Sequence, residues 1–401
     1  MSHPVAAVAA LPAVQQARAW LERYDSDTLA WQRAIAAVPA PTGNERRRAD
    51  AVAAKLAELG VENARRDEVG NLIGRWGGGG DGGETGVVVA AHLDTVFPED
   101  TDLTVRQQGA RLVAPGISDN ARGLAGLLAL AGACRHADIR LPVPLTLVAT
   151  TGEEGAGDLA GARHLFVEPT FRPVGFIALD GAGIERVVHR ALGSRRLRAV
   201  FRGPGGHSWA AFGVANPTHA VGLAAAAIGE LALPTSPRTT ASVVRIGGGS
   251  GLNTIPQEAW LELDLRSEGE AALDTLYGHA TEALARALDA ANRRRSAGTA
   301  PLTLQIVPLG YRPSGVTAPE HVLVQSAVEA TRCVGHTADL AAASTDANVA
   351  ISRGVPGIAL GAGGRGGNTH LATEWYENVD GPSGLYRALL VVCAAAGLAT
   401  S

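Results

Sequence analysis

Short runs of apolar residues alternate with segments of helical periodicity in the first half of the chain. Three of these runs, residues 87–91, 145–149 and 174–179, are continuous enough to be buried strands. A helical pattern at 121–134 lies between the first two, and a fourth apolar run, 357–360, follows far downstream. Buried strands that alternate with helices predict an α/β domain with a largely parallel central sheet.

Residues 192–310 show a different pattern, in which strands and helices take the order strand, helix, strand, strand, helix, strand. The predicted elements are 197–201, 217–231, 241–246, 258–265, 271–293 and 302–308. The order βαββαβ is that of a ferredoxin-like α+β unit. We therefore expect one domain made of residues 1–191 and 311–401, interrupted by a smaller domain of residues 192–310.

Length and charge narrow the class of protein. The 401 residues are typical of two domains, and the formal net charge is -4. This acidic balance argues against nucleic acid or an anionic membrane as the main partner, because both attract clustered positive charge. No apolar stretch is long enough to predict a membrane span. The first residues lack the basic start and apolar stretch of a secretory signal, so we expect a cytoplasmic protein.

Histidines and carboxylates follow the four predicted strands of the α/β domain. His92 follows the first apolar run, Glu153 and Glu154 the second, Asp180 the third and His370 the last. In open α/β sheets, ligands bind in the crevice beyond the carboxyl ends of the strands. We therefore expect these side chains to converge at one edge of the sheet.

Asp119 joins this group from the start of the helix predicted after the first strand. If its carboxylate bridges two divalent ions, one ion takes His92, Asp119 and Asp180, and the other takes Asp119, Glu154 and His370. Three protein ligands for each ion leave a position open for water, as in catalytic sites. A hydroxide held between two ions about 3.5–4 Å apart is a strong nucleophile at neutral pH.

Two further carboxylates have predicted roles beside the ligands. Glu153 is not needed as a ligand, so it is the candidate general base. Asp94 lies two residues after His92, and residues two apart in an extended segment point the same way. We expect the Asp94 carboxylate to orient the ring of His92.

Each of these residues alone has an ordinary explanation. A single histidine after a strand is commonly structural, and neighbouring glutamates are common on solvated surfaces. Asp119 could cap a helix, and Asp180 could be a turn residue before Gly181. Five ligating groups in order, four of them past strand ends, favour the metal site over these separate explanations.

The segments that carry these residues resemble, in order, the metal motifs of the M20 metallopeptidase family. They are His92-Leu-Asp94-Thr95, Ser118-Asp-Asn-Ala-Arg-Gly123, Thr151-Gly-Glu-Glu-Gly155, Leu179-Asp-Gly181 and Thr369-His370. The resemblance implies two zinc ions, with Co²⁺ and Mn²⁺ as alternatives. It also implies that residues 1–191 and 311–401 form a catalytic domain, and that residues 192–310 form a lid through which two chains make a homodimer.

Two C-terminal segments look most like the peptidase T-like branch of that family. They are Ser344-Thr-Asp-Ala-Asn348 and Gly363-Gly-Arg-Gly-Gly-Asn-Thr-His370-Leu-Ala-Thr-Glu374-Trp. This narrower resemblance implies an exopeptidase that acts on small peptides.

The same resemblance implies roles for three residues of the inserted domain. His207 lies in the glycine-rich segment Gly203-Pro-Gly-Gly-His207-Ser-Trp209, and in similar enzymes the matching histidine supports the tetrahedral oxyanion in the partner's active site. Asn253 and Arg266 match lid positions that contact substrate, and a guanidinium suits a bidentate grip on a carboxylate. A turn histidine, a turn asparagine and a surface arginine are the ordinary alternatives.

Three functions stay open at this point. The first is a zinc-dependent exopeptidase of the tripeptidase or aminopeptidase kind. The second is an N-acyl amino acid deacylase or carbamoyl amidohydrolase, because the metal set is indifferent to which amide is attacked. The third is a catalytically silent binding homologue, which the presence of Glu153 disfavours because such a homologue is expected to lose the base.

Overall fold

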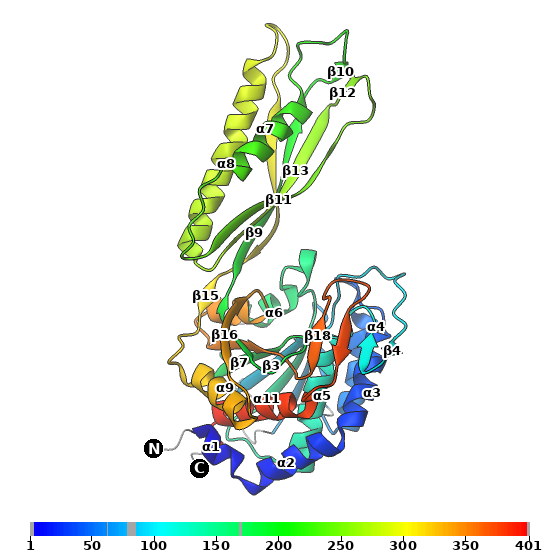
Figure 1. Cartoon of the computed structure of the whole chain (residues 1–401), viewed down its shortest axis with the longest axis vertical. Coiled ribbons are helices and arrows are strands. Elements are labelled where there is room, and N and C mark those ends of the chain that lie inside the picture. The colour runs from blue at the N-terminus through cyan, green and yellow to red at the C-terminus, as the bar shows by residue number, and fades with distance from the viewer. Residues whose placement is uncertain (1–3, 62, 78–85, 168–170, 399–401) are drawn as a thin grey trace. The chain divides into compact units, whose positions relative to one another are not determined.

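A computed structural model describes residues 4–61, 63–77, 86–167 and 171–398. The chain divides into two compact units, one of Met1–Ala191 with Val316–Ser401 and one of Leu192–Gly315. Figure 1 shows the helices and strands of both units. The inserted unit begins at residue 192, where the sequence pattern changes, and ends at Gly315 rather than at residue 310.

The first unit is built on a mixed sheet with a parallel centre (Figure 1). Its strands follow the order β1-β2-β6-β3-β7-β17-β8-β15, and β16 pairs with β8. The four strands β6, β3, β7 and β17 are parallel, and β2 and β8 flank them in the antiparallel sense. This arrangement confirms the predicted α/β class. The bounds are β1 (Arg65–Arg66), β2 (Leu72–Trp76), β3 (Val87–His92), β6 (Leu145–Thr150), β7 (Gly175–Leu179), β8 (Arg186–Ala191), β15 (Gly315–Val316), β16 (Asp339–Ala343) and β17 (Gly357–Leu360).

Helices cover both faces of this sheet, which explains why its central strands are apolar on both sides. Val87 and Val89 of β3 belong to one core cluster, and Val88 and Ala90 belong to another. The first cluster includes residues of α1 (Pro4–Ala9), α2 (Pro12–Arg23), α3 (Asp25–Ala36), α4 (Arg46–Glu58), α5 (Ala121–His136), α9 (Val322–Cys333) and α11 (Gly381–Ala395), and the second includes residues of α6 (Ala160–Leu165) and α10 (Ala347–Ser352). No described helix is both long and apolar enough to cross a membrane.

A second, smaller sheet of the first unit was not predicted from the sequence. Its order is β18-β19-β5-β4, which joins two segments of the chain more than 200 residues apart. Its strands are only three residues long, and one of them is Arg-Gly-Gly, so neither length nor side-chain pattern marks them as strands. They are β4 (Arg106–Gln108), β5 (Arg111–Val113), β18 (Arg365–Gly367) and β19 (Trp375–Glu377). This sheet places the loop after β5 beside the loop between β18 and β19.

The second unit has the predicted βαββαβ order, with its four long strands in one antiparallel sheet, β11-β13-β9-β14. Leucines and alanines of the sheet pack with two helices in a core of their own, and this strand order is ferredoxin-like. The elements are β9 (Gly193–Arg202), β10 (Gly206–His207), α7 (Pro217–Gly229), β11 (Thr239–Gly248), β12 (Thr254–Ile255), β13 (Glu258–Ser267), α8 (Glu270–Arg293) and β14 (Thr303–Arg312).

Two helical glycines are expected to respond in opposite directions to the same substitution. A Cβ on Gly123 in α5 would clash with the Leu179 carbonyl oxygen and the Asn120 side chain, whereas a Cβ on Gly278 in α8 meets nothing within 4 Å. Gly123→Ala should therefore destabilise the protein by about 1–3 kcal/mol. Gly278→Ala should stabilise it by about 0.5–1 kcal/mol, because alanine is the better helix former. Differential scanning calorimetry measures both shifts, and a stable Gly123→Ala protein would contradict the tight packing of α5 on the end of β7.

Candidate metal centre

Five side chains that the sequence singled out lie close together at the carboxyl ends of the parallel strands. His92 is the last residue of β3, Glu154 lies in the loop after β6, and Asp180 directly follows β7. His370 comes from the loop between β18 and β19, and Asp119 immediately precedes the helix cap. That cap is Asn120, whose side-chain oxygen accepts the N–H of Gly123 at 3.0 Å.

The two oxygens of the Asp119 carboxylate face different histidines. Oδ1 lies 2.9 Å from His92 Nε2, and Oδ2 lies 3.3 Å from His370 Nε2. The His92 nitrogen is 3.9 Å from Asp180 Oδ1, and the His370 nitrogen is 2.7 Å from Glu154 Oε1. Two groups of potential ligands result, His92 with Asp119 and Asp180, and Asp119 with Glu154 and His370. Each group has its ligand atoms within 4.8 Å of one another, and Asp119 belongs to both.

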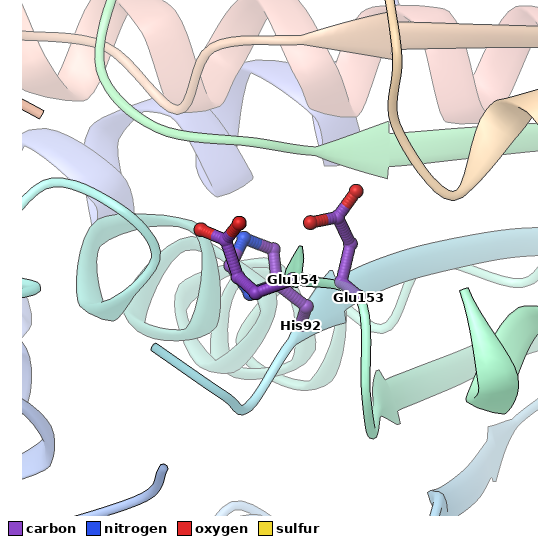
Figure 2. A group of neighbouring side chains, drawn as sticks. All are labelled: His92, Glu153 and Glu154. Carbon is purple, nitrogen blue, oxygen red and sulfur yellow. The ribbon is translucent and has the colours of Figure 1, made fainter. Parts of the chain in front are cut away.

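A third group, His92 with Glu153 and Glu154, meets the same distance limit. Figure 2 shows the three side chains gathered in one place, with the Glu154 side chain and the His92 ring overlapping in this view and the Glu153 carboxylate apart from them. Both glutamates are buried, as is His92. Geometry alone thus permits Glu153 as either a ligand or a base.

Asp94 is fully buried and makes more contacts than the sequence indicated. His92 Nδ1 donates to the Asp94 backbone oxygen at 3.0 Å and lies 3.4 Å from its carboxylate. The same carboxylate accepts the N–H groups of Glu153 and Glu154, both at 2.9 Å, and the Thr42 hydroxyl at 2.8 Å. Burial disfavours the charge, but these donors together hold the pKa of Asp94 below its ordinary value. Asp94 therefore fixes both the His92 ring and the glutamate loop.

The centre carries a surplus of negative charge. Burial raises the pKa of Asp180 to about 7, and the neighbouring Asp119 carboxylate adds to this rise. Hydrogen bonds to Asp119 and Glu154 raise the pKa of His370 to about 10. Although burial opposes it, contacts with Asp119 and Asp94 also raise the pKa of His92 well above its ordinary value. The groups therefore favour bound positive charge in this space.

The donor set fits divalent ions. Because His92 Nδ1 donates to a carbonyl oxygen, Nε2 is the nitrogen that points at Asp119 and Asp180, and its lone pair is available to a cation held together with those carboxylates. A set of donors made of imidazole nitrogens and carboxylate oxygens, with no sulfur among them, suits Zn²⁺, Co²⁺ and Mn²⁺. The three groups named above contain only such donors.

Sequence reasoning assigned no role to two other buried acids near the centre. Glu374 accepts backbone N–H groups of the loop that ends in Asp119, and burial raises its pKa to about 7. Asp346 accepts the Thr150 hydroxyl at 2.5 Å at the end of β6. Their partners are backbone or hydroxyl groups on distant segments, so no local spacing could identify them. Both lie in the two C-terminal segments, 344–348 and 363–375, that resemble the peptidase T-like branch.

The three other predicted site residues belong to the second unit. His207 lies in β10, and its Nδ1 accepts the N–H groups of Trp209 at 3.2 Å and Ala210 at 3.4 Å. In the neutral ring the proton is therefore on Nε2. The Asn253 carbonyl accepts the Ser208 N–H at 2.8 Å, and Arg266 donates to Asp264 at 2.9 Å. None of the three is a member of the ligand groups of the first unit.

Solved structures with a similar fold include several hydrolases. Aminopeptidase PepT from Bacillus cereus ATCC 10987 is 20% identical, with 94% of this chain and 99% of that chain covered at a TM-score of 0.72. A tripeptidase from Staphylococcus aureus subsp. aureus Mu50 is 20% identical, with 92% and 98% covered and a TM-score of 0.74. An amidase of the hydantoinase/carbamoylase family from Burkholderia multivorans is 17% identical, with 94% and 98% covered and a TM-score of 0.65.

A match to a protein-family model identifies the family of the chain, which similarity in fold alone does not. Residues 88–396 match the model of peptidase family M20/M25/M40, and this range includes every member of the ligand groups described above. The chain therefore belongs to peptidase family M20/M25/M40 and is a hydrolase of that family.

Proposed function

We propose that the chain is a cytoplasmic, zinc-dependent exopeptidase that cleaves an amide bond of small peptides. The observation that carries the proposal is the pair of ligand groups that share Asp119 and have Glu153 beside them. The similarity in fold to an aminopeptidase and a tripeptidase agrees with a peptide substrate.

In this proposal each side chain has a separate task. His92, Asp119 and Asp180 would hold one ion, and Asp119, Glu154 and His370 would hold the other. Two divalent ions bound there would acidify a water molecule and polarise the scissile carbonyl. As the base, Glu153 would take the proton from that water and deliver it to the departing amine. Asp94 keeps the Glu153 backbone in place through the hydrogen bond described above.

His207 is proposed to stabilise the oxyanion. Because Nδ1 accepts these backbone N–H groups, the neutral ring carries its proton on Nε2, where it can be donated to an oxyanion. By resemblance to the family, this donor would act in the active site of a second copy of the chain. Asn253 and Arg266 would bind the substrate, with the Arg266 guanidinium gripping a carboxylate.

The alternative is an N-acyl amino acid deacylase or carbamoyl amidohydrolase. The ligand groups do not discriminate between amides, and the Burkholderia multivorans amidase has a similar fold. Zinc-loaded protein should be incubated with a library of di- and tripeptides and, separately, with N-acetyl, N-succinyl and N-carbamoyl amino acids. Chelator-sensitive release of amino acids from peptides supports the exopeptidase. Turnover of the acyl or carbamoyl compounds alone supports the alternative, and no turnover of either set contradicts both.

The neighbouring glutamates provide a matched pair of variants that separates base from ligand. Glu153→Gln should lower kcat by about 100- to 10,000-fold, because glutamine cannot accept the proton, and should leave two metal ions per chain. Glu154→Gln should lose metal as well as activity. Peptide turnover and elemental analysis measure both effects. Metal loss in Glu153→Gln, with full metal content in Glu154→Gln, would show that the two roles are reversed.

We also propose that the second unit forms a homodimer through β11. Among the described strands β11 pairs only with β13, so its other edge is open to another strand. Val244 and Ile246 on this strand are 53% and 58% exposed. A hollow of about 460 Å³ lies beside them, lined by α7 and β11. An apolar open edge with an adjoining hollow suits a second copy of the same edge.

Charge introduced on this edge is expected to separate the dimer. Ile246→Asp places a carboxylate in the proposed interface, so the protein should elute as a monomer at concentrations where the parent is a dimer. Val322→Asp is the matched control, because Val322 is 55% exposed on the first unit. Light scattering after size exclusion measures both. A parent protein that is monomeric, or an Ile246→Asp protein that stays dimeric, would contradict the proposed interface.

A further inference from the structure

Glu374 is a fully buried acid whose carboxylate binds a single loop. Its Oε1 accepts the N–H groups of Ser118 and Asp119, both at 2.8 Å, and its Oε2 accepts the N–H of Gly116 at 3.1 Å. Its backbone oxygen also accepts the N–H of Ala114 at 3.0 Å. One residue thus holds the whole segment that leads from β5 to Asp119.

Glu374 also belongs to the loop that carries His370. The two residues are four positions apart, and the Glu374 N–H donates to the Leu371 oxygen at 2.9 Å. His370 itself has a left-handed φ of 68°, which is uncommon for residues other than glycine and requires support from its surroundings. The Glu374 side chain therefore joins the His370 loop directly to the backbone of Asp119.

A different residue joins Asp119 to the other ligand group. The adjacent Asn120 donates to the Leu179 oxygen at 2.9 Å and accepts the Gly181 N–H at 3.1 Å, on either side of Asp180. Asp119 consequently has two independent anchors. Asn120 sets its position relative to Asp180, and Glu374 sets its position relative to His370.

We propose that Glu374 is a positioning residue that selectively builds the group of Asp119, Glu154 and His370. The inference rests on the proposed metal pair. Loss of the Glu374 anchor changes the spacing between Asp119 and His370, while Asn120 keeps the spacing between Asp119 and Asp180. Binding of an ion by Asp119, Glu154 and His370 is therefore weakened. Binding of an ion by His92, Asp119 and Asp180 is retained.

Glu374→Gln tests this selectivity, because it keeps the size of the side chain and replaces one acceptor by an N–H₂ that faces a backbone donor. Isothermal titration of the metal-free full chain with Co²⁺ should show two binding steps for the parent. The variant should keep one step unchanged and show the other weakened about 10- to 100-fold, with an altered visible Co²⁺ absorption. Glu377→Gln is the matched control, since Glu377 lies in the same hairpin and its carboxylate faces Arg111 at 3.6 Å.

A background variant shows which group is affected. In His370→Ala, where of the two groups that share Asp119 only that of His92, Asp119 and Asp180 is complete, adding Glu374→Gln should change Co²⁺ affinity less than about threefold. Equal weakening of both steps, or a Glu374→Gln protein with both steps and the spectrum unchanged, would overturn the proposal. If thermal unfolding shows that Glu374→Gln does not fold, Glu374→Asp is measured by the same criteria. A parent that binds fewer than two Co²⁺ ions would instead contradict the metal pair of the proposed function.

Discussion

The arrangement of the candidate metal centre depends on how the repulsion is balanced between the acidic side chains that converge at the end of the sheet. Asp119, Glu154 and Asp180 lie with two histidines, and burial penalises the charge of both aspartates. Such a set is stable only when positive charge balances it, either as protons or as cations. The carboxylate of Asp119 is central because each of its oxygens faces a different histidine.

Long-range hydrogen bonds to the backbone hold these repelling groups together. Asp94 binds the loop of Glu153 and Glu154, and Glu374 binds the loop that ends in Asp119. Neither acid belongs to the two ligand groups that share Asp119, and both are fully buried. The binding of backbone N–H groups by buried carboxylates thus helps to give the centre its shape. Preorganisation of this kind reduces the cost of gathering ligands around a metal.

Hydrophobic pattern alone predicted the four parallel strands at the centre of the main sheet and the order of elements in the inserted unit, because buried strands are continuous apolar runs. The short sheet of β18, β19, β5 and β4 was missed, since its three-residue strands depend on tertiary contacts for their conformation. The predicted ligand positions depended on strand ends, which sequence reveals well. Glu374 and Thr42 escaped prediction because their partners are distant in sequence, and the roles of His207, Asn253 and Arg266 rest on family resemblance and not on contacts.

The central claim is that two metal ions share the carboxylate of Asp119 in a site made of nitrogen and oxygen donors. X-ray absorption of the zinc-loaded protein tests this most directly, because it reports ligand elements and metal separation without a substrate. The account predicts two zinc ions per chain, nitrogen and oxygen neighbours only, and zinc-to-zinc scattering at about 3.5–4 Å. A single isolated zinc ion, or zinc bound by sulfur, would contradict it.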